Sequence, residues 1–124
     1  VITTVGVVAM LAPGLFVWAS IVTPPDDATE FEAMGQQWQW AFRYPGADGI
    51  MGTADTQMVT QTNPFGVNVE DPNGQDDVIV TAPEMHLPLD KPVKALLRSN
   101  DTLHNYTVPQ FRVKMDLVPG LISY

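Results

Sequence analysis

The sequence contains no cysteine among its 124 residues. This absence excludes disulfides, zinc ribbons, iron–sulfur clusters and thiol catalysis within the chain, and it removes cysteine usage as a guide to the redox compartment. Basic residues are also few, with six lysines and arginines against 14 acidic residues and a formal net charge of −8. Such a charge argues against a nucleic-acid partner and favours a basic one, although the acidity alone is more simply explained by solubility.

A second absence concerns charge at the start of the chain. No ionisable side chain occurs between Val1 and Pro25. About 20 apolar residues in a helix span roughly 30 Å, the thickness of the hydrocarbon core of a bilayer. A signal peptide is the alternative, but the segment lacks a basic start and a small-residue cleavage site. We therefore predict a transmembrane helix over residues 1–25, with Trp18 as an anchor at the membrane interface.

The residues after this segment are acidic. Acidic side chains recur from Asp26 to Glu32, and no lysine or arginine occurs before Arg43. Because positive residues are retained on the cytoplasmic side, we expect residues 26–33 to form an acidic linker on the opposite side of the membrane. The chain also starts at the very edge of the helix, so we expect further residues upstream.

Residues 34–124 carry strand patterns and are expected to form one all-β Greek-key domain. Four aromatic side chains alternate along the first predicted strand, at Trp38, Trp40, Phe42 and Tyr44. Such stripes usually pack a core, but four are many for a small sandwich, so at least one should be exposed. Prolines exclude helix farther along and leave strands at residues 78–81 and 92–99.

Residues 46–77, between the aromatic strand and the strand predicted at 78–81, are rich in turn residues. Only 57–60 and 66–69 are candidate short strands. The acidic side chains of this region match no known calcium-loop spacing, so we interpret them as a solvated acidic lobe.

A second alternating run ends the chain. The side chains of Phe111, Val113, Met115 and Leu117 are expected on one face, and those of Arg112, Lys114 and Asp116 on the other. His104 lies just ahead of this run. A histidine in such a place is more often a satisfied core residue than a ligand, and the residues alone leave both interpretations open.

Three motifs occur in order along the chain: GQQWQW at 35–40, LHNYTVP at 103–109 and RVKMDLVPG at 112–120. They resemble subunit II of the haem–copper cytochrome c oxidases, whose last two segments read Leu-His-Ser-Trp-x-Val-Pro and x-x-Lys-x-Asp-x-x-Pro-Gly. Each motif alone is weak. Together, in this order and over most of the chain, they are specific.

The resemblance implies a cupredoxin-like Greek-key sandwich anchored by membrane helices, with residues 1–25 as the second helix of a hairpin. It also implies a binuclear copper centre, CuA, that takes electrons from cytochrome c or a similar c-type donor and passes them to haem in subunit I. The chain would then be an electron-transfer subunit of a respiratory terminal oxidase. It would sit in a bacterial inner membrane with its soluble domain in the periplasm, or in a mitochondrial inner membrane facing the intermembrane space.

The resemblance also implies roles for single residues. His104 matches a copper ligand, and Trp38 matches the exposed tryptophan at which electrons are accepted. Asp101 falls at an acidic position beside the surface that docks the donor. Lys114 and Asp116 match a charged pair expected to contact subunit I, and a merely solvated strand face is the alternative for this pair.

The sequence departs from the family in two ways. Arg43 stands where the family commonly has an acidic residue, and it would place one basic residue in the donor-docking patch. The other copper ligands lie on a later loop, so the domain is expected to lack its C-terminal part and CuA to be completed by residues after Tyr124. His86 matches no ligand of the family and is interpreted as structural.

Two other functions compete with the electron-transfer hypothesis. The first is a copper-free structural subunit II of the quinol-oxidase type, against which His104 argues. The second is a membrane-tethered binding module unrelated to respiration, which would leave the three motifs to coincidence.

Overall fold

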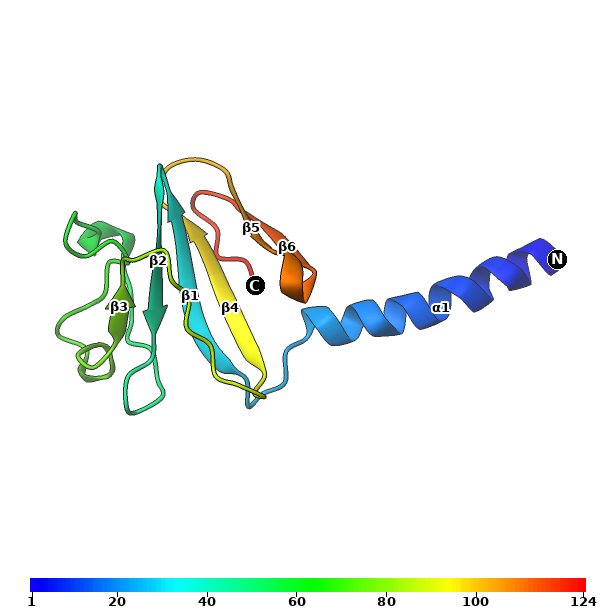
Figure 1. Ribbon diagram of the computed structural model, residues 1–124, viewed down its shortest axis with the longest axis horizontal. Helices are drawn as coiled ribbons and strands as arrows, with labels where there is room; N and C mark the ends of the chain where they lie inside the picture. Colours follow the sequence, from blue (N-terminus) through cyan, green and yellow to red (C-terminus); the bar gives the residue numbers. More distant parts are fainter.

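The computed structural model describes all residues from 1 to 124, as one long helix followed by a β-sheet domain (Figure 1). The helix is α1 (Ile2–Val22). The strands are β1 (Thr29–Gln36), β2 (Gln39–Tyr44), β3 (Val78–Val80), β4 (Val93–Ser99), β5 (His104–Val108) and β6 (Val113–Leu117). Three short 3₁₀ helices complete the elements: η1 (Thr56–Met58), η2 (Pro72–Gly74) and η3 (Pro109–Phe111).

Helix α1 projects away from the domain, and none of its residues is buried (Figure 1). By length and composition it is able to cross a membrane. The connection to the domain is shorter than the linker expected over 26–33, because β1 already begins at Thr29. Phe31 and Ala33 alternate into the core, and this burial makes the second half of the acidic segment a strand.

The domain has two layers. A four-stranded sheet has the order β3-β2-β1-β4, in which β1 and β4 are parallel and the other pairs antiparallel. Strands β5 and β6 form an antiparallel hairpin that makes the second layer. The main core lies between them and consists of Phe31, Ala33, Phe42, Leu97, Tyr106 and Leu117. The expected strands at 78–81 and 92–99 are confirmed as β3 and β4.

The aromatic alternation is correct within β2 but does not include Trp38. Trp40 and Tyr44 pack against the main core, in which Phe42 is buried, whereas Ala41 belongs to a cluster on the other face. Trp38 lies in the two-residue turn between β1 and β2, since Gln36 pairs with Gln39. A turn residue is not bound by the two-residue period of a strand, and so the side chain of Trp38 is 91% exposed.

The second alternating run begins later than expected. Phe111 ends η3, and Arg112 follows with a left-handed backbone (φ 55°), which breaks the period before β6 starts at Val113. Phe111 is therefore exposed, whereas Met115 and Leu117 point into the core as expected. The prediction was wrong at Phe111 because residues 109–112 form the turn between β5 and β6, where the two-residue period of a strand does not hold.

The region 46–77 folds onto the outer face of the large sheet, where Phe65 and Val67 pack with Met34 and Ala41. The two candidate strands are not formed. Residues 56–58 are the 3₁₀ helix η1, and Val67 makes only an isolated bridge with Ala54. We refer to residues 46–77 as the outer lobe.

Candidate functional site

His104 begins β5 on the face of the hairpin that is turned toward the large sheet. Leu117, its partner across the hairpin, is fully buried. The imidazole lies edge-on to the Trp40 ring, with 6.3 Å between the ring centroids. It is therefore part of the wall of the core and remains partly accessible.

Asp101 holds one nitrogen of this imidazole. Its Oδ1 lies 2.6 Å from His104 Nε2, and it also accepts a hydrogen bond from the backbone N–H of Thr102 (2.7 Å). The hydrogen bond to His104, followed by one from the backbone N–H of Gln37, lowers the pKa of the Asp101 carboxyl to about 2. An ionised carboxylate only accepts hydrogen bonds, so Nε2 of the neutral imidazole must carry the proton.

No hydrogen bond occupies Nδ1 of His104, so it is the ring nitrogen that remains available to a metal. A histidine whose protonated nitrogen is held by a carboxylate has the arrangement typical of a metal ligand. The ring thus fits one copper ligand. The chain has no cysteine, and nowhere in residues 1–124 do three or more His, Asp or Glu side chains come together as a metal-binding group.

The Trp38 turn is tied to the loop that carries His104. Asp101 Oδ2 accepts a hydrogen bond from the backbone N–H of Gln37 (2.7 Å), next to Trp38. Asn100 donates its backbone N–H to the carbonyl of Gly35 (3.1 Å) and its side-chain amide to Gln36 Oε1 (3.2 Å). One end of the domain thus joins the exposed tryptophan and the histidine through a few hydrogen bonds.

Lys114 and Asp116 lie on the outward face of the hairpin and are exposed. Asp116 accepts a hydrogen bond from the side-chain amide of Asn105 (2.6 Å), and Lys114 makes no ion pair within residues 1–124. Lys114 and Asp116 share this face because they are two positions apart in β6, but no ion pair joins them. Their contact with another subunit stays a prediction.

The side chain of His86 is exposed, with its Nε2 3.8 Å from Glu84. Its backbone N–H donates to the hydroxyl of Tyr44 (2.8 Å), and this contact belongs to the packing of the chain. Burial raises the pKa of that Tyr44 hydroxyl. No other ligand-type side chain accompanies His86 apart from Glu84.

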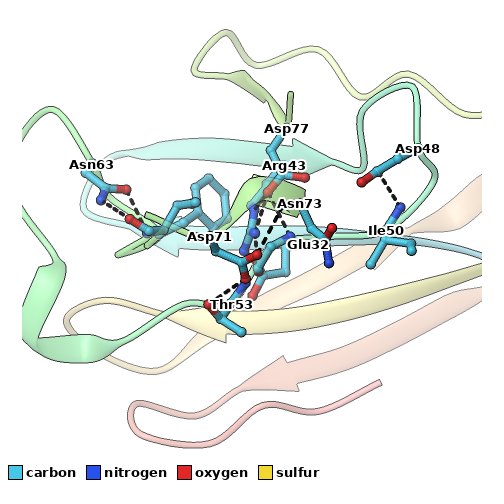
Figure 2. Close-up of polar contacts among 12 residues, drawn as sticks. Glu32, Arg43, Asp48, Ile50, Thr53, Asn63, Asp71, Asn73 and Asp77 are labelled. Carbon is cyan, nitrogen blue, oxygen red and sulfur yellow. Dashed lines mark hydrogen bonds and ion pairs between the residues drawn. The ribbon is translucent and has the colours of Figure 1, made fainter. Parts of the chain in front are cut away.

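Arg43 is not a docking residue. Only 1% of it is exposed, and its guanidinium lies beneath the outer lobe (Figure 2). It donates to Glu32 Oε2 (2.9 Å) and, through Nε, to Asp77 Oδ2 (2.9 Å). Glu32 also pairs with Arg98 (2.9 Å), so two cations and two carboxylates form one buried network.

This network corrects two predictions. Arg43 adds no positive charge to the docking patch, because β2 turns it to the opposite face from Trp40. The outer lobe is not simply solvated, since the Asp77 side chain is buried within it. The backbone of Gly52 binds both members of the ion pair formed by Arg43 and Asp77. The carbonyl of Gly52 accepts from Arg43 Nη2, and its N–H donates to Asp77 Oδ2 (3.1 Å). The one sequence feature that could have indicated a structural role for Asp77 is its position directly before β3.

A family model described as cytochrome c oxidase subunit II, periplasmic domain, matches residues 29–124. The chain belongs to this family. An alternative cytochrome c oxidase subunit 2 from Bradyrhizobium diazoefficiens is 60% identical over 122 residues, which cover 98% of this chain and 44% of the relative. Cytochrome c oxidase subunit 2 of Apis koschevnikovi is 29% identical over 92 residues, covering 74% of this chain and 36% of that protein.

The periplasmic domain of subunit II of cytochrome oxidase (CoxB) from Bradyrhizobium japonicum has a similar fold. The match has a TM-score of 0.50 and 24% identity, and it covers 82% of this chain and 63% of that one. The expected cupredoxin-like β-domain behind one N-terminal apolar helix is therefore confirmed. The chain spans less than half the length of the curated relatives it matches.

Proposed function

We propose that the protein is the electron-transfer subunit of a respiratory terminal oxidase, accepting electrons from a c-type donor at CuA and passing them to haem in subunit I. The observation that carries the proposal is the contact of His104 Nε2 with Asp101, which leaves Nδ1 without a hydrogen-bond partner. Membership of the subunit II family supports the same assignment. In this role bound copper supplies a centre that changes its charge by one electron.

The residues of this chain would hold the copper ligand and orient it. His104 offers Nδ1 as a ligand, and the Asp101 carboxylate fixes the tautomer and the plane of the ring. Trp38 presents an exposed aromatic surface on the turn that Asp101 binds through Gln37. A donor docked on Trp38 would thus meet a site with few freely rotating parts, as fast electron transfer requires.

The charged residues fit the partners of such a subunit. The side chain of Asp101 remains one-third exposed, so it still contributes negative charge beside Trp38, which favours a basic donor. Lys114 and Asp116 provide a charged outward face for subunit I. In the domain arrangement that we propose, residues 1–25 span the bilayer and residues 29–124, with the whole of β1, form the domain on its non-cytoplasmic side.

The experiment compares two histidine variants of the full-length protein. His104→Ala should abolish or distort the near-infrared absorption of CuA while the domain still folds, and the matched control His86→Ala should leave the spectrum unchanged. An unchanged spectrum in His104→Ala would remove His104 from the site. If the full-length wild type binds no copper, the copper-free scaffold becomes the better assignment.

A second variant tests the path of the electron. Trp38→Phe should retain copper and slow the oxidation of the donor, because the exposed indole is replaced by a smaller ring. Normal donor oxidation in this variant would show that electrons are accepted elsewhere.

A further inference from the structure

Gly35 lies directly against the His104 side chain. A Cβ atom at position 35 would be 3.1 Å from both Cβ and Cγ of His104 and 3.3 Å from its Cδ2. These distances are tighter than ordinary van der Waals contacts, so one of the two neighbours would have to move by a few tenths of an ångström. The hydrogen atom of the glycine leaves just enough room for the imidazole.

The backbone of Gly35 is held on both sides. It pairs with Trp40 on β2 and with Ser99 on β4, so it lies in the middle of the sheet. Its carbonyl also accepts the hydrogen bond from the N–H of Asn100, at the start of the loop that leads to His104. A side chain at position 35 would therefore displace the imidazole and leave the strand in place.

The imidazole has few directions in which to move. Its Nε2 is bound to Asp101, and the Trp40 ring lies on another side. The three atoms of His104 nearest to a Cβ at position 35 are Cβ, Cγ and Cδ2, and Nδ1 is not among them. A push from position 35 would thus tilt the ring, change the direction of Nδ1 and strain the bond to Asp101.

From this packing we infer that Gly35 is a positioning residue for His104, and that the absence of its side chain sets the direction in which Nδ1 is presented to copper. The inference rests on the proposed function of His104. It assigns a role in the site to the first residue of the GQQWQW motif, apart from any need for glycine in a turn, because the φ of Gly35 is not positive.

The experiment uses Gly35→Ala in the full-length protein and Ala41→Gly as a control. Ala41 is buried on the opposite face of the sheet, so its variant perturbs packing without touching the histidine. In the metal-free protein, the NMR signals of the His104 ring should shift in Gly35→Ala and not in Ala41→Gly. With copper added, Gly35→Ala should lose about 10-fold in affinity, as expected for a residue that orients a ligand, and its near-infrared band should move.

A double variant provides a rescue. Gly35→Ala/Trp40→Phe gives the imidazole room on its other side, so part of the copper affinity should return, which a merely destabilised protein would not show. The double variant also serves if Gly35→Ala alone does not fold. Ring signals and copper affinity in Gly35→Ala equal to those of the wild type would overturn the inference. A wild type that binds no copper would instead overturn the proposed function, and with it the role in copper binding.

Discussion

Asp101 and His104 are joined by a contact of 2.6 Å between Oδ1 and Nε2, and the other oxygen of the same carboxylate binds the turn that carries Trp38. One side chain therefore fixes both the histidine and the exposed tryptophan. The charge of Asp101 is thus used inside the site as well as at the docking surface. From the sequence, Asp101 was expected only beside the docking surface.

The Asp101 contact makes the stability of the domain depend on pH. Its pKa in the folded protein is lowered to about 2, below the value of about 3.9 in an unfolded chain. A lowered carboxyl pKa contributes stability above about pH 4, and this contribution is lost as the pH falls through 2.

Asp101→Asn keeps the size and shape of the side chain but replaces one carboxylate oxygen by an amide group and removes the charge. Urea unfolding at several pH values should show the variant less stable than the wild type at pH 6, with the difference shrinking from pH 4 to pH 2. A difference that stays constant over this range would contradict the assigned hydrogen bond between His104 and an ionised Asp101. Asp90→Asn, at an exposed residue, is the control.

Helix α1 is expected to need apolar side chains along its whole length in order to insert into a membrane. Leu11 lies near its middle, and Leu11→Asp should disfavour insertion by about 2.5–3.5 kcal/mol. When residues 1–124 are produced alone, α1 is their one candidate membrane span, so the fraction of Leu11→Asp that stays in membranes after alkaline carbonate extraction should fall, whereas Leu11→Ala should leave it unchanged. Equal retention of both variants would contradict a membrane-spanning α1.

The sequence predicted those parts of the fold in which side-chain period and burial agree. Strands β3 and β4 and the inward face of β6 are of this kind. The resemblance predicted the exposure of Trp38, which is confirmed, but the alternation placed both Trp38 and Phe111 wrongly. Each lies in a turn between two strands, where the two-residue period does not hold. Such a turn depends on backbone conformation, such as the left-handed Arg112, which composition does not reveal.

The site was predicted through the family motifs and only partly through the residues. His104 and Asp101 were both named in advance, but Asp101 only as a docking residue, because their separation of three positions in a loop does not predict a contact. The contact of Asp101 with the Trp38 turn could not be predicted either, since it joins residues 64 positions apart. The Arg43 network was missed for a related reason. A basic residue in an alternating strand looks exposed until a lobe from elsewhere in the chain supplies buried carboxylates.

The outer lobe should depend on a close approach of two glycines. A Cβ atom at Gly52 would lie 2.2 Å from Gly74 Cα and 2.5 Å from Gly74 N, and backbone atoms cannot yield as a side chain does. Gly52→Ala should therefore destabilise the domain by about 3 kcal/mol and expose residues 46–77 to limited proteolysis.

Gly49→Ala is the matched control for this variant. Gly49 has a φ of 73° but open space around it, so the substitution should cost only about 1 kcal/mol of backbone strain. If both variants resist proteolysis equally, the glycine contact does not hold the lobe.

Arg43 should be among the most sensitive residues of the domain. Removing it leaves Asp77 with only the N–H of Gly52 as a donor and Glu32 with Arg98 alone. Breaking a buried ion pair by removing one partner costs about 3–5 kcal/mol, because a charge stays buried without compensation. Urea unfolding of Arg43→Met should show a loss in this range.

The exposed pair of Lys94 and Glu30 is the natural comparison, with 2.7 Å between Lys94 Nζ and Glu30 Oε1. Lys94→Met should destabilise the domain far less than Arg43→Met, since solvent screens such pairs. The double variant Arg43→Met/Asp77→Asn should recover part of the stability lost in Arg43→Met, because it removes a stranded carboxylate. A loss below about 1 kcal/mol in Arg43→Met would mean that water reaches these carboxylates and compensates for the missing guanidinium.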